Sequence, residues 1–123
     1  MPSAIHPKQI EKAYLIGLTT DSRQKQEVAE SLEELKQLAL STGTAVIGKR
    51  VQVRPRPDSR YFIGKGLVDE IKNEMGQLGG TCVIFDDILS PAQQRNLEEA
   101  FELKVIDRPI LILDLFATRA RTA

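Results

Sequence analysis

The sequence lacks several of the residues on which common functional sites depend. Its 123 residues include one cysteine, Cys82, and one histidine, His6. A single cysteine cannot form an internal disulfide or a cysteine-based metal site, which suits a reducing compartment. His6 stands alone near the terminus, and Cys82 falls in a predicted core strand. No Ser-His-Asp or Cys-His catalytic arrangement is therefore expected.

The sequence also lacks an excess of either charge and any long apolar run. Its 17 basic and 17 acidic side chains cancel, so no global field points to nucleic acid or to membrane. No apolar run approaches the roughly 20 residues that span a bilayer, and the first residues contain no signal-peptide core. We therefore expect a cytoplasmic protein of one small domain, long enough to bury a core.

Strand and helix patterns alternate along the chain. Compact apolar runs rich in strand formers are separated by segments with apolar residues at helical spacing. Because helical connections join parallel strands, we predict an α/β fold, with βαβ repeats forming a mainly parallel sheet of about four strands flanked by helices. Residues 1–11 are assigned to an N-terminal tail and residues 12–123 to the domain. Strands are predicted at 12–20, 44–53, 81–85 and 104–108. Helices are predicted at about 24–40, over a segment that carries Leu67 to Leu78 and ends at Gly79, from 91 and from 109.

One glycine pattern resembles the phosphate-binding loop of nucleotide hydrolases. Gly43–Arg50 fits the first seven places of G-x-x-x-x-G-K-[ST]. However, Arg50 stands where a hydroxyl should bind Mg²⁺, and Val46 and Ile47 favour a strand over a loop wrapped round a phosphate. We interpret this segment as the end of a helix followed by a strand.

A second glycine pattern begins a helix. Gly64 and Gly66 lie between an extended segment and the helix, where backbone N–H groups can cradle a phosphate. Asp69 replaces the third glycine of the dinucleotide fingerprint, so a tight turn before a helix is the plainer interpretation. Lys65 in this turn is still a candidate contact for a phosphate of RNA or of a nucleotide.

Two adjacent carboxylates, Asp86 and Asp87, follow the predicted strand at 81–85. Ligand sites gather at the carboxyl ends of parallel strands. Adjacent strand residues point opposite ways, however, so the pair cannot chelate one metal ion unless a loop reorients it. Capping, turn and interface roles are the alternative. Ser90 is predicted to cap the next helix, with Pro91 at its first position and Gln93 completing a capping box.

Basic residues gather in one short region although the total charge is zero. Only Asp58 opposes them there. A loop of this kind can engage phosphates, although a solvated loop is the alternative. Tyr61 and Phe62 can either stack on bases or anchor the loop to the core. The candidate phosphate contacts are Lys49, Arg50, Arg54, Arg56, Arg60 and Lys65.

The last predicted helix is more apolar than one buried face requires. Ile110, Leu111, Leu113 and Leu115 lie close together within it. A helix with so much apolar surface is expected to pack against further protein. That protein is either the remainder of a longer chain or a second copy in a homodimer.

Three segments together resemble the N-terminal domain of HflX-family GTPases, ribosome-associated GTP-binding proteins of the TRAFAC class. They read YFIGKGLVDEI, VIFDDILSPAQQRNLEEAF and VIDRPILILDLFATRART, and the similarity covers about residues 12–123. Pro109 replaces the usual threonine of the family, a change that favours the helix start. The motif residues to which we assign structural roles are Gly64, Gly66, Asp86, Asp87, Ser90, Pro91, Arg95, Asp107 and Arg108.

The resemblance implies a parent protein in which this domain precedes a helical subdomain and a G domain. GTP and Mg²⁺ would bind to the G domain, and the parent would associate with the RNA and protein of the large ribosomal subunit to split or rescue stalled ribosomes. This chain would then be a docking and regulatory module without catalytic, cofactor or metal residues. Its two aspartates would pair with Arg95 or Arg108, or with a basic surface of the other domains. One alternative is a self-contained nucleotide-binding (ATP) domain, an enzyme that uses Gly64, Lys65, Gly66 and the two aspartates. Another is a module that dimerises through its last helix.

Overall fold

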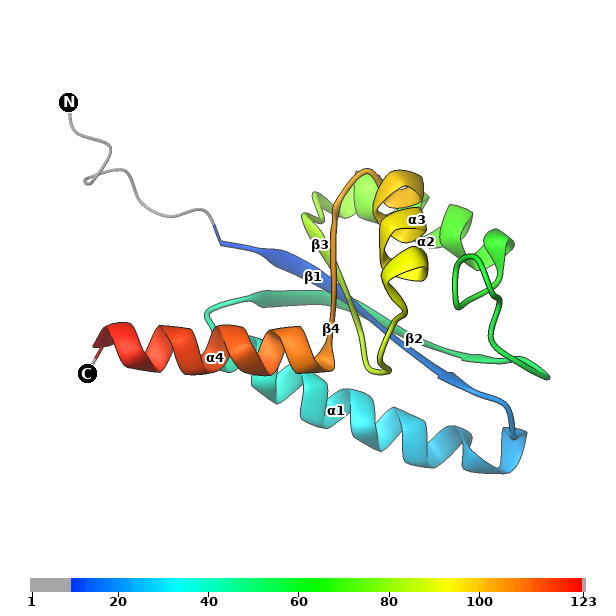
Figure 1. Cartoon of the computed structure of the whole chain (residues 1–123), viewed down its shortest axis with the longest axis horizontal. Helices are drawn as coiled ribbons and strands as arrows, with labels where there is room; N and C mark the ends of the chain where they lie inside the picture. Colours follow the sequence, from blue (N-terminus) through cyan, green and yellow to red (C-terminus); the bar gives the residue numbers. More distant parts are fainter. Residues whose placement is uncertain (1–9, 123) are drawn as a thin grey trace.

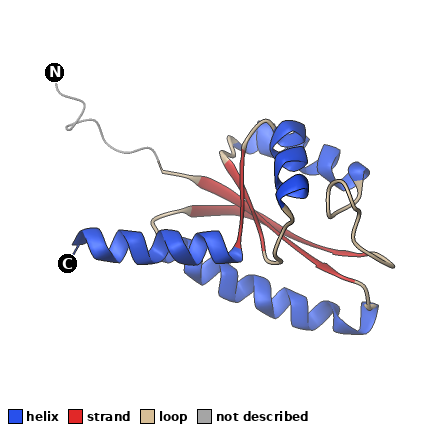
Figure 2. Cartoon of the chain, viewed as in Figure 1, coloured by secondary structure: helices blue, strands red, loops and turns tan. Residues whose placement is uncertain are grey.

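The chain forms a parallel sheet with helices on both faces (Figures 1 and 2). The computed structural model describes residues 10–122, so His6 and most of the predicted tail lie outside the described residues. Every predicted strand and helix is present, and the predicted strand bounds are confirmed to within one residue. The elements are β1 (Lys12–Thr19), a 3₁₀ turn η2 (Ser22–Gln24), α1 (Lys25–Ser41), β2 (Ala45–Val53), α2 (Lys65–Leu78), β3 (Cys82–Phe85), α3 (Pro91–Phe101), β4 (Lys104–Asp107) and α4 (Arg108–Thr122).

The four strands lie in the order β2-β1-β3-β4, and all three neighbouring pairs are parallel. The predicted α/β fold is therefore confirmed. Helices α1 and α4 cover one face of the sheet, and α2 and α3 cover the other (Figure 1). All four residues of β3 are buried, as expected for a central strand covered on both faces.

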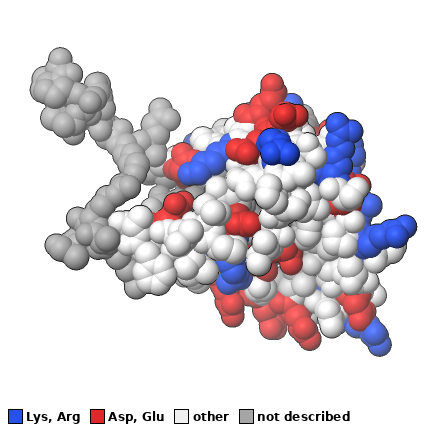
Figure 3. Space-filling view, viewed as in Figure 1, with Lys and Arg blue, Asp and Glu red and all other residues white. Residues whose placement is uncertain are grey.

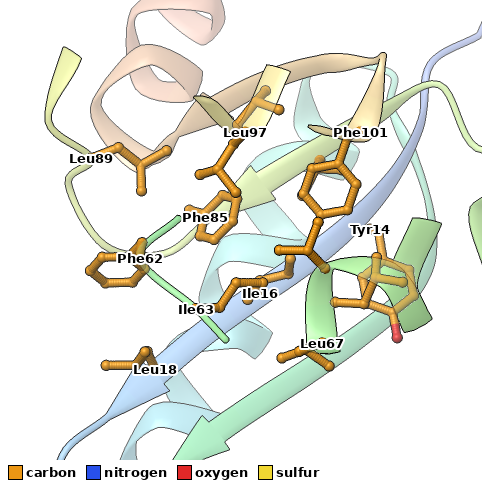
Figure 4. Packing of buried hydrophobic residues seen from close by; sticks show 14 of the residues in the cluster. Tyr14, Ile16, Leu18, Phe62, Ile63, Leu67, Phe85, Leu89, Leu97 and Phe101 are labelled. Carbon is orange, nitrogen blue, oxygen red and sulfur yellow. The ribbon is translucent and has the colours of Figure 1, made fainter. Parts of the chain in front are cut away.

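The core has two halves because side chains alternate between the faces of each strand. On the α2/α3 side, Tyr14, Ile16 and Phe85 pack with apolar residues of the two helices (Figure 4). Phe62 joins this half from the loop before α2, and its ring meets that of Phe85 edge-on, with centroids 6.0 Å apart. Phe62 is therefore a core anchor of its loop. The other half contains Ala13, Leu15, Leu32, Leu35, Ala39, Cys82, Ile84, Ile106 and Leu111.

Helix ends follow the predicted capping chemistry. The Ser90 hydroxyl accepts the backbone N–H of Gln93 at 3.1 Å, and the Gln93 side chain accepts the backbone N–H of Ser90 at 3.0 Å. This reciprocal pair confirms the capping box of α3. Gly79 ends α2 in the left-handed region, at φ 70°, where glycine carries no Cβ penalty.

One predicted boundary required correction. Arg108, predicted as the end of a strand, is the first residue of α4. The reason is Asp107, whose carboxylate accepts the N–H of Ile110 at 3.4 Å and so starts the helix one residue early. Before α1, Asp21 caps the short 3₁₀ turn η2, where its side chain accepts the N–H of Arg23.

Helix α4 leaves much of its apolar surface uncovered, as its composition predicted. Leu111 is buried, but Leu113 and Phe116 are each 62% exposed. The far end of α4 projects past the sheet (Figure 1). Within residues 10–122, no helix combines the length and apolar character that crossing a membrane requires.

Candidate functional site at the carboxyl edge of the sheet

The strand order creates a switch point between β1 and β3. The chain leaves β1 toward α1 on one face, and it leaves β3 toward α3 on the other (Figure 1). In open α/β sheets, ligands bind at the carboxyl ends of strands at such a point. We use the term carboxyl edge for a set of polar residues at the strand ends or within two residues after them: Thr19, Asp21, Arg54, Asp86, Asp87, Asp107 and Arg108.

Arg108 connects three elements at this edge. Its Nε donates to Asp86 Oδ1 at 2.9 Å, and its Nη2 donates to the backbone oxygen and the hydroxyl of Ser31 at 2.9 and 3.0 Å. Only 24% of the Arg108 side chain and 10% of the Asp86 side chain are exposed. The pair therefore ties the end of β3 to α1 and to the start of α4. Of the two predicted partners of the aspartates, Arg108 is confirmed, and Arg95 makes no ion pair within residues 10–122.

Asp87 lies in a different environment from its neighbour. Its Oδ2 atom is buried and has no hydrogen-bond partner within the described part of the chain. Burial, and then the negative charge of Asp86, raise the pKa of Asp87, against smaller lowering effects of the Leu18 backbone and of Arg108. The two aspartates therefore differ in chemistry: one is half of an ion pair, and the other is a buried acceptor.

Asp107 holds the β3–α3 loop against the start of α4. Its side chain accepts the N–H of Leu89 at 3.1 Å through one oxygen and that of Ile110 at 3.4 Å through the other. The residue is 6% exposed. Sequence reasoning named Asp107 as a motif residue but missed these contacts. The available signal was an aspartate two residues before Pro109, an arrangement typical of a helix start.

Three of the six predicted phosphate contacts are engaged by carboxylates. Lys49 Nζ lies 3.1 Å from Glu33, Arg50 Nη2 lies 2.7 Å from Glu74, and Lys65 Nζ lies 2.8 Å from Asp69. Lys49 and Arg50 are adjacent on β2 and therefore point to opposite faces of the sheet. The six cations do not form one continuous patch.

The other three cations, Arg54, Arg56 and Arg60, lie in the loop between β2 and α2, which we call the arginine loop. None of the three forms an ion pair within residues 10–122. Arg54 Nε donates to the backbone oxygen of Arg56 at 3.2 Å, and the Arg60 guanidinium lies 5.4 Å from the ring centroid of Tyr61. Figure 3 shows Lys and Arg side chains projecting on the side of the molecule that carries this loop.

The arginine loop is ordered by its own backbone. Asp58 and Phe62 exchange two backbone hydrogen bonds, each 2.9 Å long. The Asp58 carboxylate also accepts the N–H groups of Arg60 and Tyr61 at 2.9 and 2.7 Å. Asp58 was predicted only as the charge that opposes the basic residues. Its structural role is to close the turn that presents them.

Two side chains of α3 hold the arginine loop by hydrogen bonds to its backbone. The side-chain amide of Gln93 donates to the backbone oxygen of Asp58 at 2.9 Å, and that of Asn96 donates to the backbone oxygen of Arg60 at 3.1 Å. Sequence analysis missed both tethers, because residues 58 and 93 are far apart along the chain. The loop is thus held from three sides, by its turn, by α3 and by the buried Phe62 ring.

The predicted glycine turn lies beside the arginine loop. The N–H of Gly64 donates to the Gln52 side chain at 2.8 Å, and α2 begins without a side-chain cap. A Cβ on Gly64 would lie 2.6 Å from the Arg54 guanidinium, so glycine makes room for that side chain. A Cβ on Gly66 would meet no atom within 4 Å, so the packing around this residue does not require glycine.

Comparison with known proteins agrees with these motifs. Residues 29–117 match the profile of a family described as GTP-binding GTPase N-terminal. The chain is also 40% identical over 123 residues to the GTPase HflX of Lacrimispora saccharolytica, and 45% identical over 93 residues to that of Escherichia coli. This chain belongs to the HflX N-terminal domain family. The alignments cover 99% and 76% of this chain, but 29% and 22% of the two relatives.

Solved structures share the fold of this HflX N-terminal domain. A complex of SsGBP with GDP superimposes with a TM-score of 0.63 at 19% identity, covering 88% of this chain and 29% of that protein. A G235S variant of SsGBP gives a TM-score of 0.67 at 20% identity, covering 88% of this chain and 32% of that one. The chain therefore spans less than a third of the proteins that it resembles.

Proposed function

We propose that this HflX N-terminal domain is a non-catalytic docking and regulatory module, which brings a GTPase to the large ribosomal subunit. GTP and Mg²⁺ are bound, and GTP is hydrolysed, by a G domain outside this chain, and a helical subdomain connects the two. The complete protein acts in the cytoplasm, where it helps to split or rescue stalled ribosomes.

The arginine loop is the observation that supports docking to RNA. Arg54, Arg56 and Arg60 have no carboxylate partner within residues 10–122, whereas the other three predicted cations are paired. Guanidinium groups bind phosphates through several N–H donors. Because the loop is fastened by its turn, by α3 and by Phe62, less conformational entropy is lost when it meets an RNA backbone.

Co-sedimentation with purified large ribosomal subunits tests this proposal. We expect the 123-residue chain to sediment with the subunits at low salt, and the variant R54E/R56E/R60E to remain in the supernatant. Lys36→Glu changes the charge of a lysine on α1 and serves as the matched control, which should sediment like the unaltered chain. Equal sedimentation of the triple variant and the unaltered chain would remove the arginine loop from the interface.

A self-contained nucleotide site is the second candidate, favoured by one observation. The start of α2 has no side-chain cap, and the Arg54 guanidinium lies beside Gly64. Isothermal titration with ATP, GTP and GDP, each with Mg²⁺, separates the two functions. Our proposal predicts no binding heat with any of them. Saturable ATP binding that Lys65→Ala abolishes would establish a nucleotide site in this domain.

A further inference from the structure

The outer edge of β2 offers a second surface, separate from the arginine loop. We propose that it binds an extended acidic peptide segment, which pairs with β2 as a fifth strand of the sheet. β2 is an edge strand of nine residues, whereas the opposite edge strand, β4, has four. An edge strand with unpaired backbone groups is a template for strand addition.

The hydrogen-bond pattern identifies the outward-facing residues of β2. The Arg54 N–H donates to the Thr19 backbone oxygen of β1 at 3.0 Å. In a parallel ladder, every second residue directs both backbone groups toward the same neighbour. The register runs without interruption from Gly48 to Val53, so residues 48, 50 and 52 bond to β1. Lys49, Val51 and Val53 therefore turn their N–H and C=O groups toward the open edge.

A groove of about 290 Å³ lies between this edge strand and α1. Three of its lining residues are apolar and none is acidic, and Lys25 and Lys49 are its basic side chains. Arg50 also lines the groove, but its guanidinium pairs with Glu74 on the other face of the sheet. β2 also contains no fully buried residue, unlike β1, in which seven of eight residues are buried. An added strand would cover the half-exposed apolar side chains of β2. The groove is lined by Lys25, Ala29 and Leu32 of α1 and by Lys49, Arg50 and Val51 of β2.

The charges of the groove favour an acidic partner over a second copy of this chain. Lys49 and its partner Glu33 are 46% and 54% exposed. A pair this exposed contributes at most about 1 kcal/mol, so an incoming carboxylate can replace Glu33. Lys25 has no ion pair within residues 10–122. Two copies that paired through β2 would instead bring Lys49 and Arg50 close to the same residues of the other copy, and lysine on an edge strand discourages such pairing.

Fluorescence anisotropy with a labelled peptide tests the proposal. The probe is a peptide of about eight residues with alternating valine and glutamate, a length typical of one strand. A matched peptide with lysine in place of glutamate is the control. We expect saturable binding of the acidic peptide only. R54Q/R56Q/R60Q removes the charges of the arginine loop without adding negative ones, and it should still bind the acidic peptide saturably. This result is therefore independent of ribosome docking.

Two variants probe the outer edge itself. Val51→Pro removes an N–H that faces the open edge and leaves the ladder to β1 intact, and it should weaken peptide binding about tenfold or more. Circular dichroism checks its fold. Lys49→Glu changes no backbone group and should also weaken peptide binding about tenfold or more. It therefore tests the proposal even if the proline variant unfolds.

Three results would overturn the assignment. The first is no binding of the acidic peptide, and the second is equal binding of the acidic and basic peptides. The third is a concentration-dependent mass in light scattering that Val51→Pro abolishes, which would assign the edge to a second copy of the chain.

Discussion

At the scale of single residues, neighbours in the sequence can have opposite effects on stability. Asp86 is nine-tenths buried, but the Arg108 guanidinium compensates its charge. Asp87 has a buried oxygen without a partner, and burial raises the pKa of its carboxyl group. A paired buried carboxylate stabilises the fold relative to its unpaired form, whereas a carboxylate with an unpartnered buried oxygen carries a desolvation cost that its other contacts offset only in part.

Replacing Asp87 by asparagine should stabilise the chain near neutral pH. A carboxyl group whose pKa is raised by folding favours the folded state below its ordinary pKa of 3.8, and it loses that contribution as pH rises through the raised value. We expect Asp87→Asn to increase the free energy of unfolding by about 1 kcal/mol near neutral pH, with the difference fading in more acidic solution. Urea denaturation across this pH range measures it. A variant that is less stable than the unaltered chain at neutral pH would contradict this account.

Replacing Asp86 should have the opposite effect. Asp86→Asn leaves the half-buried Arg108 without its nearest carboxylate, and we expect it to destabilise the chain by about 2 kcal/mol. A double-mutant cycle with Arg108→Met measures the coupling between the two side chains, again by urea denaturation. Arg95→Met is the control, with an expected change within about 0.5 kcal/mol. Additive effects of Asp86→Asn and Arg108→Met would show that the ion pair contributes no coupling.

At the scale of elements, α3 both covers the sheet and holds the arginine loop in place. Its capping box starts the helix, and the same Gln93 side chain that closes the box also holds Asp58 of the arginine loop. One turn later, Asn96 holds the backbone of Arg60. Sequence periodicity predicted the helix and its cap, because both depend on local chemistry. The tethers depend on which loop lies beside the helix, and only the fold determines that.

Removing the tethers should loosen the arginine loop without unfolding the domain. In Gln93→Ala/Asn96→Ala, we expect the backbone N–H groups of Asp58 and Phe62 to exchange with deuterium about tenfold faster, while those of β1 keep their rates. Gln94→Ala is the control, because the neighbouring Gln94 side chain bonds to Val105 of β4 instead. Hydrogen exchange followed by mass spectrometry or NMR measures both. Unchanged protection at Asp58 and Phe62 would show that the loop's own turn is sufficient to hold it.

At the scale of the whole molecule, the sequence predicted the strands and helices of the fold, but it did not predict which charged side chains pair on the surface. Buried strands such as 82–85 have continuous apolar patterns that periodicity detects. The basic cluster looked continuous in the sequence, yet the pleat of β2 sends Lys49 and Arg50 to opposite faces, where Glu33 and Glu74 meet them. These partners lie 16 and 24 residues away along the chain, and no local pattern connects them.

We propose that a chain of zero net charge binds RNA through three clustered arginines. The most direct test is the salt dependence of its affinity for large-subunit RNA, measured by filter binding for the unaltered chain and for R54Q/R56Q/R60Q. Each lost phosphate contact lowers the slope of log affinity against log salt by about 0.7–0.9, so we predict a slope smaller by about 2–3 in the variant. Equal slopes for the two proteins would contradict docking through the arginine loop.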